Sequence, residues 1–172
     1  NTKNNELGQK SLTSTVLGAS MNFANSTVST LVAKITDDNP SGLSVISAGL
    51  QGAPFNVPSN FANSVQNASI EAFKQDGALF HIGCRYVTGP NTVSVAYNRY
   101  NDSRPADADV SSLGVAYSYA LSKRTDLNAV LVRYDNGDRG QVAPGGNGYL
   151  GGVTASAGTD STGLALGVRH RF

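Results

Sequence analysis

Apolar and polar residues alternate with a period of two along seven stretches of the chain. In "SSLGVAYSYAL" (residues 111–121), Leu, Val and Tyr alternate with Ser, Gly and Ala from Ser112 onward. Strict alternation of this length is typical of a β-strand with one apolar and one polar face. The pattern predicts strands at residues 11–23, 27–36, 77–88, 92–101, 110–121, 127–135 and 161–172, and the register within 27–36 and 127–135 stays open.

The connections between the predicted strands alternate in length. Tight breaks such as "GPN" (89–91) and "SKRTD" (122–126) alternate with longer polar segments, of which 37–76 and 136–160 are long loops rich in Gly, Ser and Asn. Within the first long loop, "SVQNASIEAFK" (64–74) predicts a short helix. This rhythm would put all short turns at one end of a barrel, as in outer-membrane proteins. We therefore predict an all-β, antiparallel, up-and-down transmembrane β-barrel.

The composition agrees with a membrane-embedded sheet. Charged residues make up 15% of the chain, against about 25% in a typical soluble protein. The polar faces carry Ser, Gly, Ala, Asn and Thr with isolated Arg, and such small groups suit a wetted interior. No run reaches the ~18 apolar residues of a transmembrane helix, but a transmembrane strand needs only about 9–11 residues. Aromatic residues fall on the apolar faces, several near strand ends, where an interfacial girdle would place them: Phe23, Phe80, Tyr86, Tyr97, Tyr117, Tyr119 and Phe172.

The sequence does not indicate an enzyme, a metal site or a nucleic-acid site. A net charge of +1 gives no basic field for nucleic acid, and the single Cys84 is interpreted as a small apolar filler. "GNGYLG" (146–151) spells a dinucleotide-binding pattern, but no buried strand precedes it and no helix follows. "DNGD" (135–138) lacks the spacing of a calcium loop and is interpreted as a solvated turn. We predict no catalytic residue, no cofactor and no metal.

Two stretches carry a resemblance to a known family: "AYSYALSKRTDLNAVLVRYDN" (116–136) and the closing "TGLALGVRHRF" (162–172). Together they resemble the carboxyl-terminal part of the general diffusion porins of Gram-negative bacteria, of the beta-proteobacterial type. The resemblance implies a homotrimer of sixteen-stranded barrels in the outer membrane, in which residues 1–172 are the carboxyl-terminal portion of one barrel domain. The constriction loop of that family belongs to the amino-terminal half and would be absent here.

For such a protein the resemblance implies passive diffusion of small hydrophilic solutes and ions through a water-filled pore. In the alternating pattern, the strand positions that face the lumen include His81, Arg85, Arg169 and Arg171. Lys34 faces the lumen as well if Val32 shares its face. A wall lined by these cations would favour anions. The alternative interpretation is that they only face solvent or lipopolysaccharide.

The closing strand has the opposite set of positions facing lipid: Leu164, Leu166, Val168, His170 and Phe172. This set resembles the signature that the family's barrel-assembly machinery recognises, so Phe172 would be both a membrane anchor and an assembly signal. We expect Phe172 to be a true carboxyl terminus, and a missing portion to precede Asn1.

An open sheet of seven strands would expose unpaired edges to hydrocarbon, at several kcal/mol per group. Either the functional chain is longer, or strands come from another copy. A second function class also stays open, namely a non-conducting surface β-barrel or adhesin-like protein that acts through its long loops.

Overall fold

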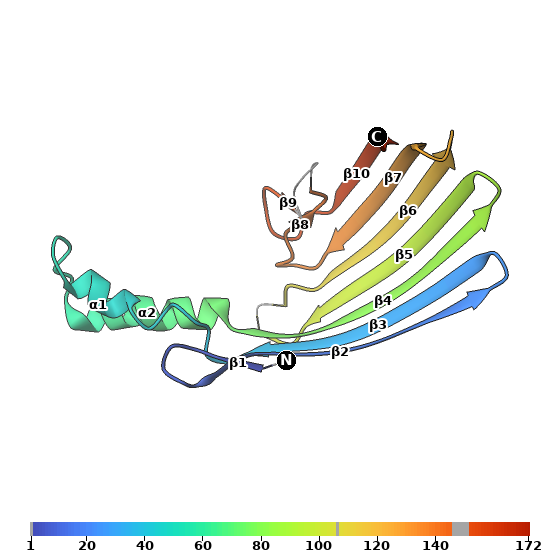
Figure 1. Ribbon diagram of the computed structural model, residues 1–172. Helices are drawn as coiled ribbons and strands as arrows, with labels where there is room; N and C mark the ends of the chain where they lie inside the picture. Colours follow the sequence, from blue (N-terminus) through green and yellow to red (C-terminus); the bar gives the residue numbers. More distant parts are fainter. Residues whose placement is uncertain (1, 106, 146–151) are drawn as a thin grey trace. The chain divides into compact units, whose positions relative to one another are not determined.

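The computed structural model describes residues 2–105, 107–145 and 152–172. Its main feature is an eight-stranded sheet in which strands follow one another in the order β1-β2-β3-β4-β5-β6-β7-β10, with a separate two-stranded ribbon β8-β9 (Figure 1). The strands of the sheet are β1 Thr2–Asn4, β2 Lys10–Phe23, β3 Ser26–Asp37, β4 Gln75–Thr88, β5 Asn91–Asp102, β6 Val110–Ala120, β7 Thr125–Asn136 and β10 Ser161–His170. Neighbours pair antiparallel wherever the register is resolved, so the sheet has the predicted all-β, up-and-down class.

The structure also contains elements that the sequence pattern did not predict. β1 lies within the first eight residues and pairs with β2, through Thr2 opposite Thr13 and Asn4 opposite Lys10. The long loop 37–76 holds two helices, α1 Ile46–Gln51, which the sequence did not indicate, and α2 Ser59–Phe73, which overlaps the short helix predicted at 64–74. The loop 136–160 holds the ribbon of β8 Val142–Ala143 and β9 Gly152–Val153. The seven predicted strands correspond to β2–β7 and β10, and the short elements β1, α1, β8 and β9 are additions to them.

The chain divides into two compact units. The first comprises residues 1–15 and 34–77, and the second comprises residues 16–33 and 78–172. In the first unit the two helices pack through small and polar side chains. Ala62 of α2 is fully buried, and Ser47 of α1 donates from Oγ to Asn63 Oδ1 (2.5 Å) and from its amide to Gln66 Oε1 (2.9 Å). Among the described residues, no helix is long and apolar enough to cross a membrane.

A carboxylate outside the strands ties the first unit together. Glu6, in the turn between β1 and β2, accepts hydrogen bonds from the Ser44 hydroxyl (2.5 Å) and from the Gly42 amide (3.0 Å). These bonds stabilise the ionised carboxylate and lower the pKa of Glu6 to about 2, with the Ser44 hydroxyl as the larger cause. The contact joins the β1–β2 turn to the segment that leads into α1.

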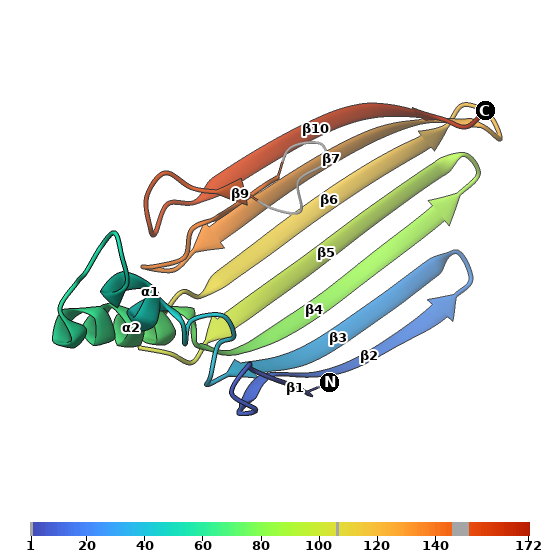
Figure 2. The same cartoon turned by 60° about the vertical axis from the view of Figure 1, so that its left-hand side comes forward.

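In the second unit the long strands lie side by side with their hairpin turns at one end (Figure 2). The resolved register aligns residues of one kind across neighbouring strands and so defines two faces. We call the polar face the one that carries these residues: Ser94, Ala96, Asn98 and Tyr100 of β5; Val110, Ser112, Gly114, Ala116 and Ser118 of β6; Asp126, Asn128, Val130, Val132 and Tyr134 of β7; Ser161, Gly163, Ala165, Gly167 and Arg169 of β10. The apolar face carries the alternate residues, including Val93, Val95, Tyr97, Leu113, Val115, Tyr117, Tyr119, Leu131, Leu164, Leu166 and Val168.

Burial is inverted relative to a soluble protein. Leu166 on the apolar face is 76% exposed, whereas Ser112 on the polar face is only 6% exposed. Among the described residues, the buried hydrophobic side chains are two alanines, Ala33 and Ala62. Because burial of apolar surface is the dominant driving force for folding in water, a sheet with this pattern needs an apolar medium against its apolar face.

Candidate channel wall

The polar face combines small residues with a few charged and hydrogen-bonding side chains. Ser, Gly and Ala alternate with apolar residues in β6 because each lies on the opposite side of the pleat from its neighbour in sequence. Their small side chains project only a short way from the sheet. The register also assigns faces to the strand at 127–135, where the sequence left the choice open: Asn128 pairs with Ser118 and Gly167, and so lies on the polar face.

A hydrogen-bonded chain of side chains crosses three strands of the polar face. His81 Nδ1 of β4 lies 2.6 Å from Asn98 Oδ1 of β5, and Asn98 Nδ2 donates to Ser112 Oγ of β6 (3.1 Å). Since an amide oxygen can only accept, the imidazole donates from Nδ1. A Cβ at the neighbouring Gly83 would lie 3.2 Å from His81 Nε2, so the glycine gives the ring its space. The chain holds the imidazole in one orientation on the polar face.

Arg169, which the sequence placed toward the lumen, lies directly opposite Asp126 in the β7–β10 register. Its Nε donates to Asp126 Oδ2 at 2.5 Å, and the Arg169 side chain is more exposed than the carboxylate, 58% against 19%. The Arg169 guanidinium is thus a charged group on the polar face, but the Asp126 carboxylate neutralises most of its electric field at a distance.

Arg85 lies in β4 at the same parity as His81, and its side chain is exposed. In the described part of the chain, no carboxylate pairs with it. Arg171 follows the end of β10, and its backbone amide donates to the carbonyl of Arg124 in the β6–β7 turn (2.9 Å). The role of these arginines as pore-lining residues remains a prediction.

Lys34 is not brought together with His81 and Arg85. Lys34 forms an ion pair with Asp76 of β4. Asp76 lies five residues before His81 in the same strand, so alternation puts the side chains of Asp76 and His81 on opposite sides of β4. Val32 and Lys34 share one parity in β3, and both are exposed. The role of Lys34 as a pore-lining residue stays a prediction.

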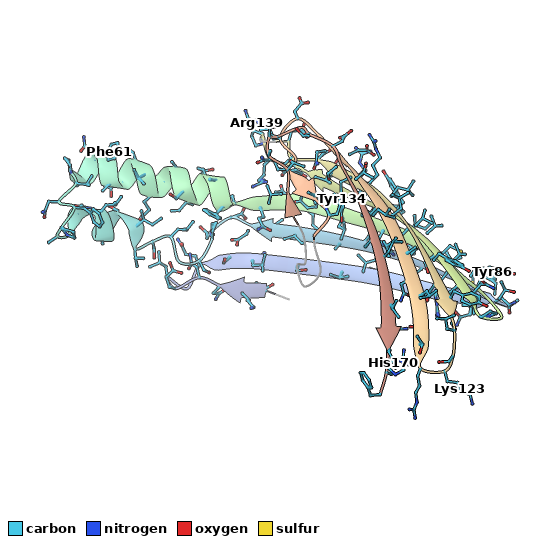
Figure 3. The ribbon with its side chains drawn as sticks, turned by 90° about the horizontal axis from the view of Figure 1, so that it is seen from above. Phe61, Tyr86, Lys123, Tyr134, Arg139 and His170 are labelled. Atoms are coloured by element: carbon cyan, nitrogen blue, oxygen red, sulfur yellow. The ribbon has the colours of Figure 1, made fainter. Side chains whose placement is uncertain are left out.

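Ion pairs gather at the end of the second unit opposite the hairpin turns. Arg104 donates from Nε to Asp102 Oδ1 (2.8 Å), and this hydrogen bond raises the pKa of the Arg104 guanidinium. Arg133 bridges two carboxylates, Asp135 at 2.7 Å and Asp160 at 2.8 Å. In Figure 3, Tyr134 and Arg139 mark this end, and Tyr86, Lys123 and His170 mark the other. Each of these pairs joins residues at the bases of the loops.

The loop after β7 folds onto the polar face, which the sequence did not indicate. We call residues 140–144 and 152–154, which contain β8 and β9, the inner ribbon. Pro144 of the ribbon lies against Gly163 of β10, where an added Cβ would come within 2.7 Å of the proline ring. The Ser161 hydroxyl of the polar face donates to the carbonyl of Val142 (3.0 Å). The pattern "GNGYLG" falls on residues 146–151, which lie outside the described residues.

The closing residues combine an exposed apolar row with an aromatic contact. Leu164, Leu166 and Val168 are all exposed on the apolar face. His170 Nδ1 lies 2.9 Å from Thr125 Oγ1, and the ring of His170 meets that of Phe172 edge-on, with ring centroids 4.8 Å apart. An imidazole and a phenyl ring in contact at a strand end suit the boundary between lipid and water. Recognition of this row by an assembly machinery remains a prediction.

A sheet with an exposed apolar face, a small-residue polar face and hairpin turns at one end is typical of outer-membrane β-proteins. Comparison with known families agrees: residues 1–139 match the model of the Gram-negative porin family. The chain belongs to this family, and its location is the bacterial outer membrane. No curated protein matches the chain.

Among solved structures, the chain is similar in fold to an anion-selective porin from Comamonas acidovorans. The TM-score is 0.65 at 22% sequence identity, and the match covers 92% of this chain. It covers 39% of the porin, so the chain spans about two fifths of the length of that protein.

Proposed function

We propose that this chain forms part of the wall of a water-filled channel for passive diffusion of small hydrophilic solutes and ions across the outer membrane. The observation that carries the proposal is the inverted burial: apolar side chains such as Leu166 face outward, and small polar residues such as Ser112 occupy the other face. A wall of this kind meets lipid on one side and water on the other.

The complete channel requires closure of the sheet. β1 and β10 lie at the two edges of the described sheet, and each backbone group left unpaired in hydrocarbon costs several kcal/mol. We propose that further strands of a longer barrel close it, as in the solved porin, of which the chain covers 39%. Assembly as a homotrimer, contact with lipopolysaccharide, and insertion by the assembly machinery through the row that ends at Phe172 belong to the same proposal.

We also propose that the channel prefers anions. Arg85 is the strongest support, because it shares the face of His81 and has no carboxylate partner among the described residues. Arg169 contributes less because Asp126 neutralises it. The similar solved structure is described as anion-selective, and its fold provides the same kind of wall.

Planar-bilayer recording of the complete native protein tests the proposal. A correctly folded, heat-modifiable preparation is added to a bilayer between potassium chloride solutions of unequal concentration. Stepwise conductance increases are expected, with a reversal potential whose sign shows net anion flux. The same preparation after boiling is the control and produces no steps. A folded protein that never conducts would contradict the channel and would support the non-conducting surface barrel instead.

A further inference from the structure

The inner ribbon is attached to the sheet mainly through the side chain of Asn136, beside one hydrogen bond from the Ser161 hydroxyl to the Val142 carbonyl. Asn136, the last residue of β7, donates from Nδ2 to the carbonyls of Val142 (2.9 Å) and Thr159 (2.7 Å). Its Oδ1 accepts from the amide of Val142 (2.9 Å). Val142 lies in the leg that enters the ribbon, and Thr159 in the leg that leaves it. One amide therefore binds both legs of the loop where they meet the polar face.

A second contact holds the ribbon closer to its tip. A Cβ built on Gly163 would lie 2.7 Å from both Cβ and Cγ of Pro144, a separation at which something must shift. Gly167 lies four residues further along the same face of β10, and a Cβ there meets nothing within 4 Å. The missing side chain at Gly163 is thus specifically what lets the ribbon touch the wall.

Between these two contacts the ribbon is not tightly packed. A cavity of about 300 Å³ separates Gln141 and Val142 of the ribbon from Tyr100, Val110 and Tyr134 of the sheet. Apolar packing across this gap contributes little, because side chains separated by a cavity lose their dispersion contacts. The three hydrogen bonds of Asn136, the single hydrogen bond of Ser161 and the contact at Gly163 therefore account for most of the attachment.

We propose that Asn136 is the positioning residue of the inner ribbon and that it keeps the aqueous path open by clamping the ribbon to the wall. This inference rests on the proposed channel function. The ribbon lies on the polar face, which bounds the path, so detachment moves it into the path. A channel with an intact clamp conducts steadily, and a channel without it is interrupted by brief closures.

Two pairs of variants of the complete protein test this clamp. Asn136→Ala removes all three side-chain hydrogen bonds, and Asn128→Ala is its control, since Asn128 lies in the same strand and on the same face away from the ribbon. Gly163→Ala inserts a methyl group against Pro144, and Gly167→Ala inserts the same group into open space. The two changes break the attachment in unrelated ways, so a shared phenotype points to the ribbon.

Single-channel recording is the readout, together with amide hydrogen exchange at Val142 in the folded protein. Because a hydrogen bond of this kind is worth roughly a factor of ten in an equilibrium, Asn136→Ala is expected to raise the fraction of time in brief closures about tenfold. Faster exchange at Val142 should accompany it. Gly163→Ala is expected to show the same closures, whereas Asn128→Ala and Gly167→Ala should record like the unmodified channel.

The outcomes separate this inference from the proposed function. If the unmodified protein conducts and both test variants give wild-type traces, the clamp is overturned and the channel stands. If the control variants flicker as much as the test variants, the effect is not specific to the ribbon, and the clamp is again overturned. An unmodified, folded protein that never conducts overturns the channel and the clamp together.

Discussion

Removing the carboxylate partner of Arg169 should make the channel more selective for anions. In the native pair the Arg169 guanidinium lies 2.5 Å from Asp126 Oδ2, so an ion passing along the polar face meets a short dipole instead of a full charge. Asp126→Asn keeps the size and hydrogen-bonding shape of the side chain but leaves the guanidinium, which stays protonated, as a net positive charge. The strands themselves retain their backbone pairing.

The expected size of the effect follows from Coulomb's law. A unit charge about 7 Å from an ion in water is worth about 0.6 kcal/mol, and screening at 0.1 M salt reduces this to about 0.3 kcal/mol. An anion is stabilised by this energy and a cation is destabilised by it, so the difference between them changes by about 0.6 kcal/mol. The anion-to-cation permeability ratio therefore rises roughly threefold. At 1 M salt the Debye length falls to about 3 Å, and the shift should nearly vanish.

The assay is the reversal potential of the complete protein in a planar bilayer under a tenfold salt gradient. Asp135→Asn is the control: it is the same chemical change in the same strand and removes one of the two carboxylates that Arg133 bridges. The odd residues of β7, Asp135 among them, face away from the polar face. An unchanged reversal potential in Asp126→Asn at low salt, or an equal shift in Asp135→Asn, would refute the assignment of the polar face to the pore.

Three further outcomes are expected. Leu166→Arg places a charge on the apolar face at mid-strand and should destabilise the membrane-inserted protein by about 2–4 kcal/mol, measured by urea unfolding from liposomes. Ala165→Arg places the same charge on the polar face and should change stability far less. Ala62→Leu overpacks a fully buried site between the two helices and should lower the stability of the first unit by about 1–3 kcal/mol. The measurement is amide exchange in α1, which should become faster. Ala68 is exposed, so Ala68→Leu should leave this exchange unchanged. The hydrogen bonds of Glu6 lower its pKa from 4.5 to about 2. Its contact therefore stabilises the first unit fully above about pH 4.5, and this stabilisation is lost as the pH falls toward 2. A titration of Glu6 by carboxyl-carbon NMR that centres near 4.5 would contradict this.

The faces of the long strands were readable from the sequence because each face meets a different solvent. In residues 112–120 every Leu, Val and Tyr faces outward and every Ser, Gly and Ala faces inward, so a period of two appears without interruption. The elements that sequence analysis missed are short. β1 has three residues and β8 has two, and alternation has no meaning over such lengths.

The partners of charged residues could not be predicted for a different reason. Alternation indicates the face of Arg169, but its partner Asp126 lies 43 positions away on the next strand, and only the pairing register brings them together. Asn136 presents the same problem, because it binds the carbonyl of Thr159, 23 residues later, through a loop with no periodic pattern. Glycine at position 163 would have been the one local signal, and it is indistinguishable in sequence from Gly167, where the space stays empty.

The absence of a buried apolar core among the described residues bears on how such a chain drifts over evolutionary time. A soluble domain must preserve interlocking side-chain volumes, since a single methylene too many or too few is felt in a close-packed interior. Here the outward-facing positions contact fluid acyl chains that adapt to any apolar shape, so Leu, Val and Ile can replace one another there at little cost. A relative can then share the fold with a TM-score of 0.65 while only 22% of positions are identical. Selection is expected to act instead on the inward-facing positions, where an added side chain narrows the path or displaces the ribbon.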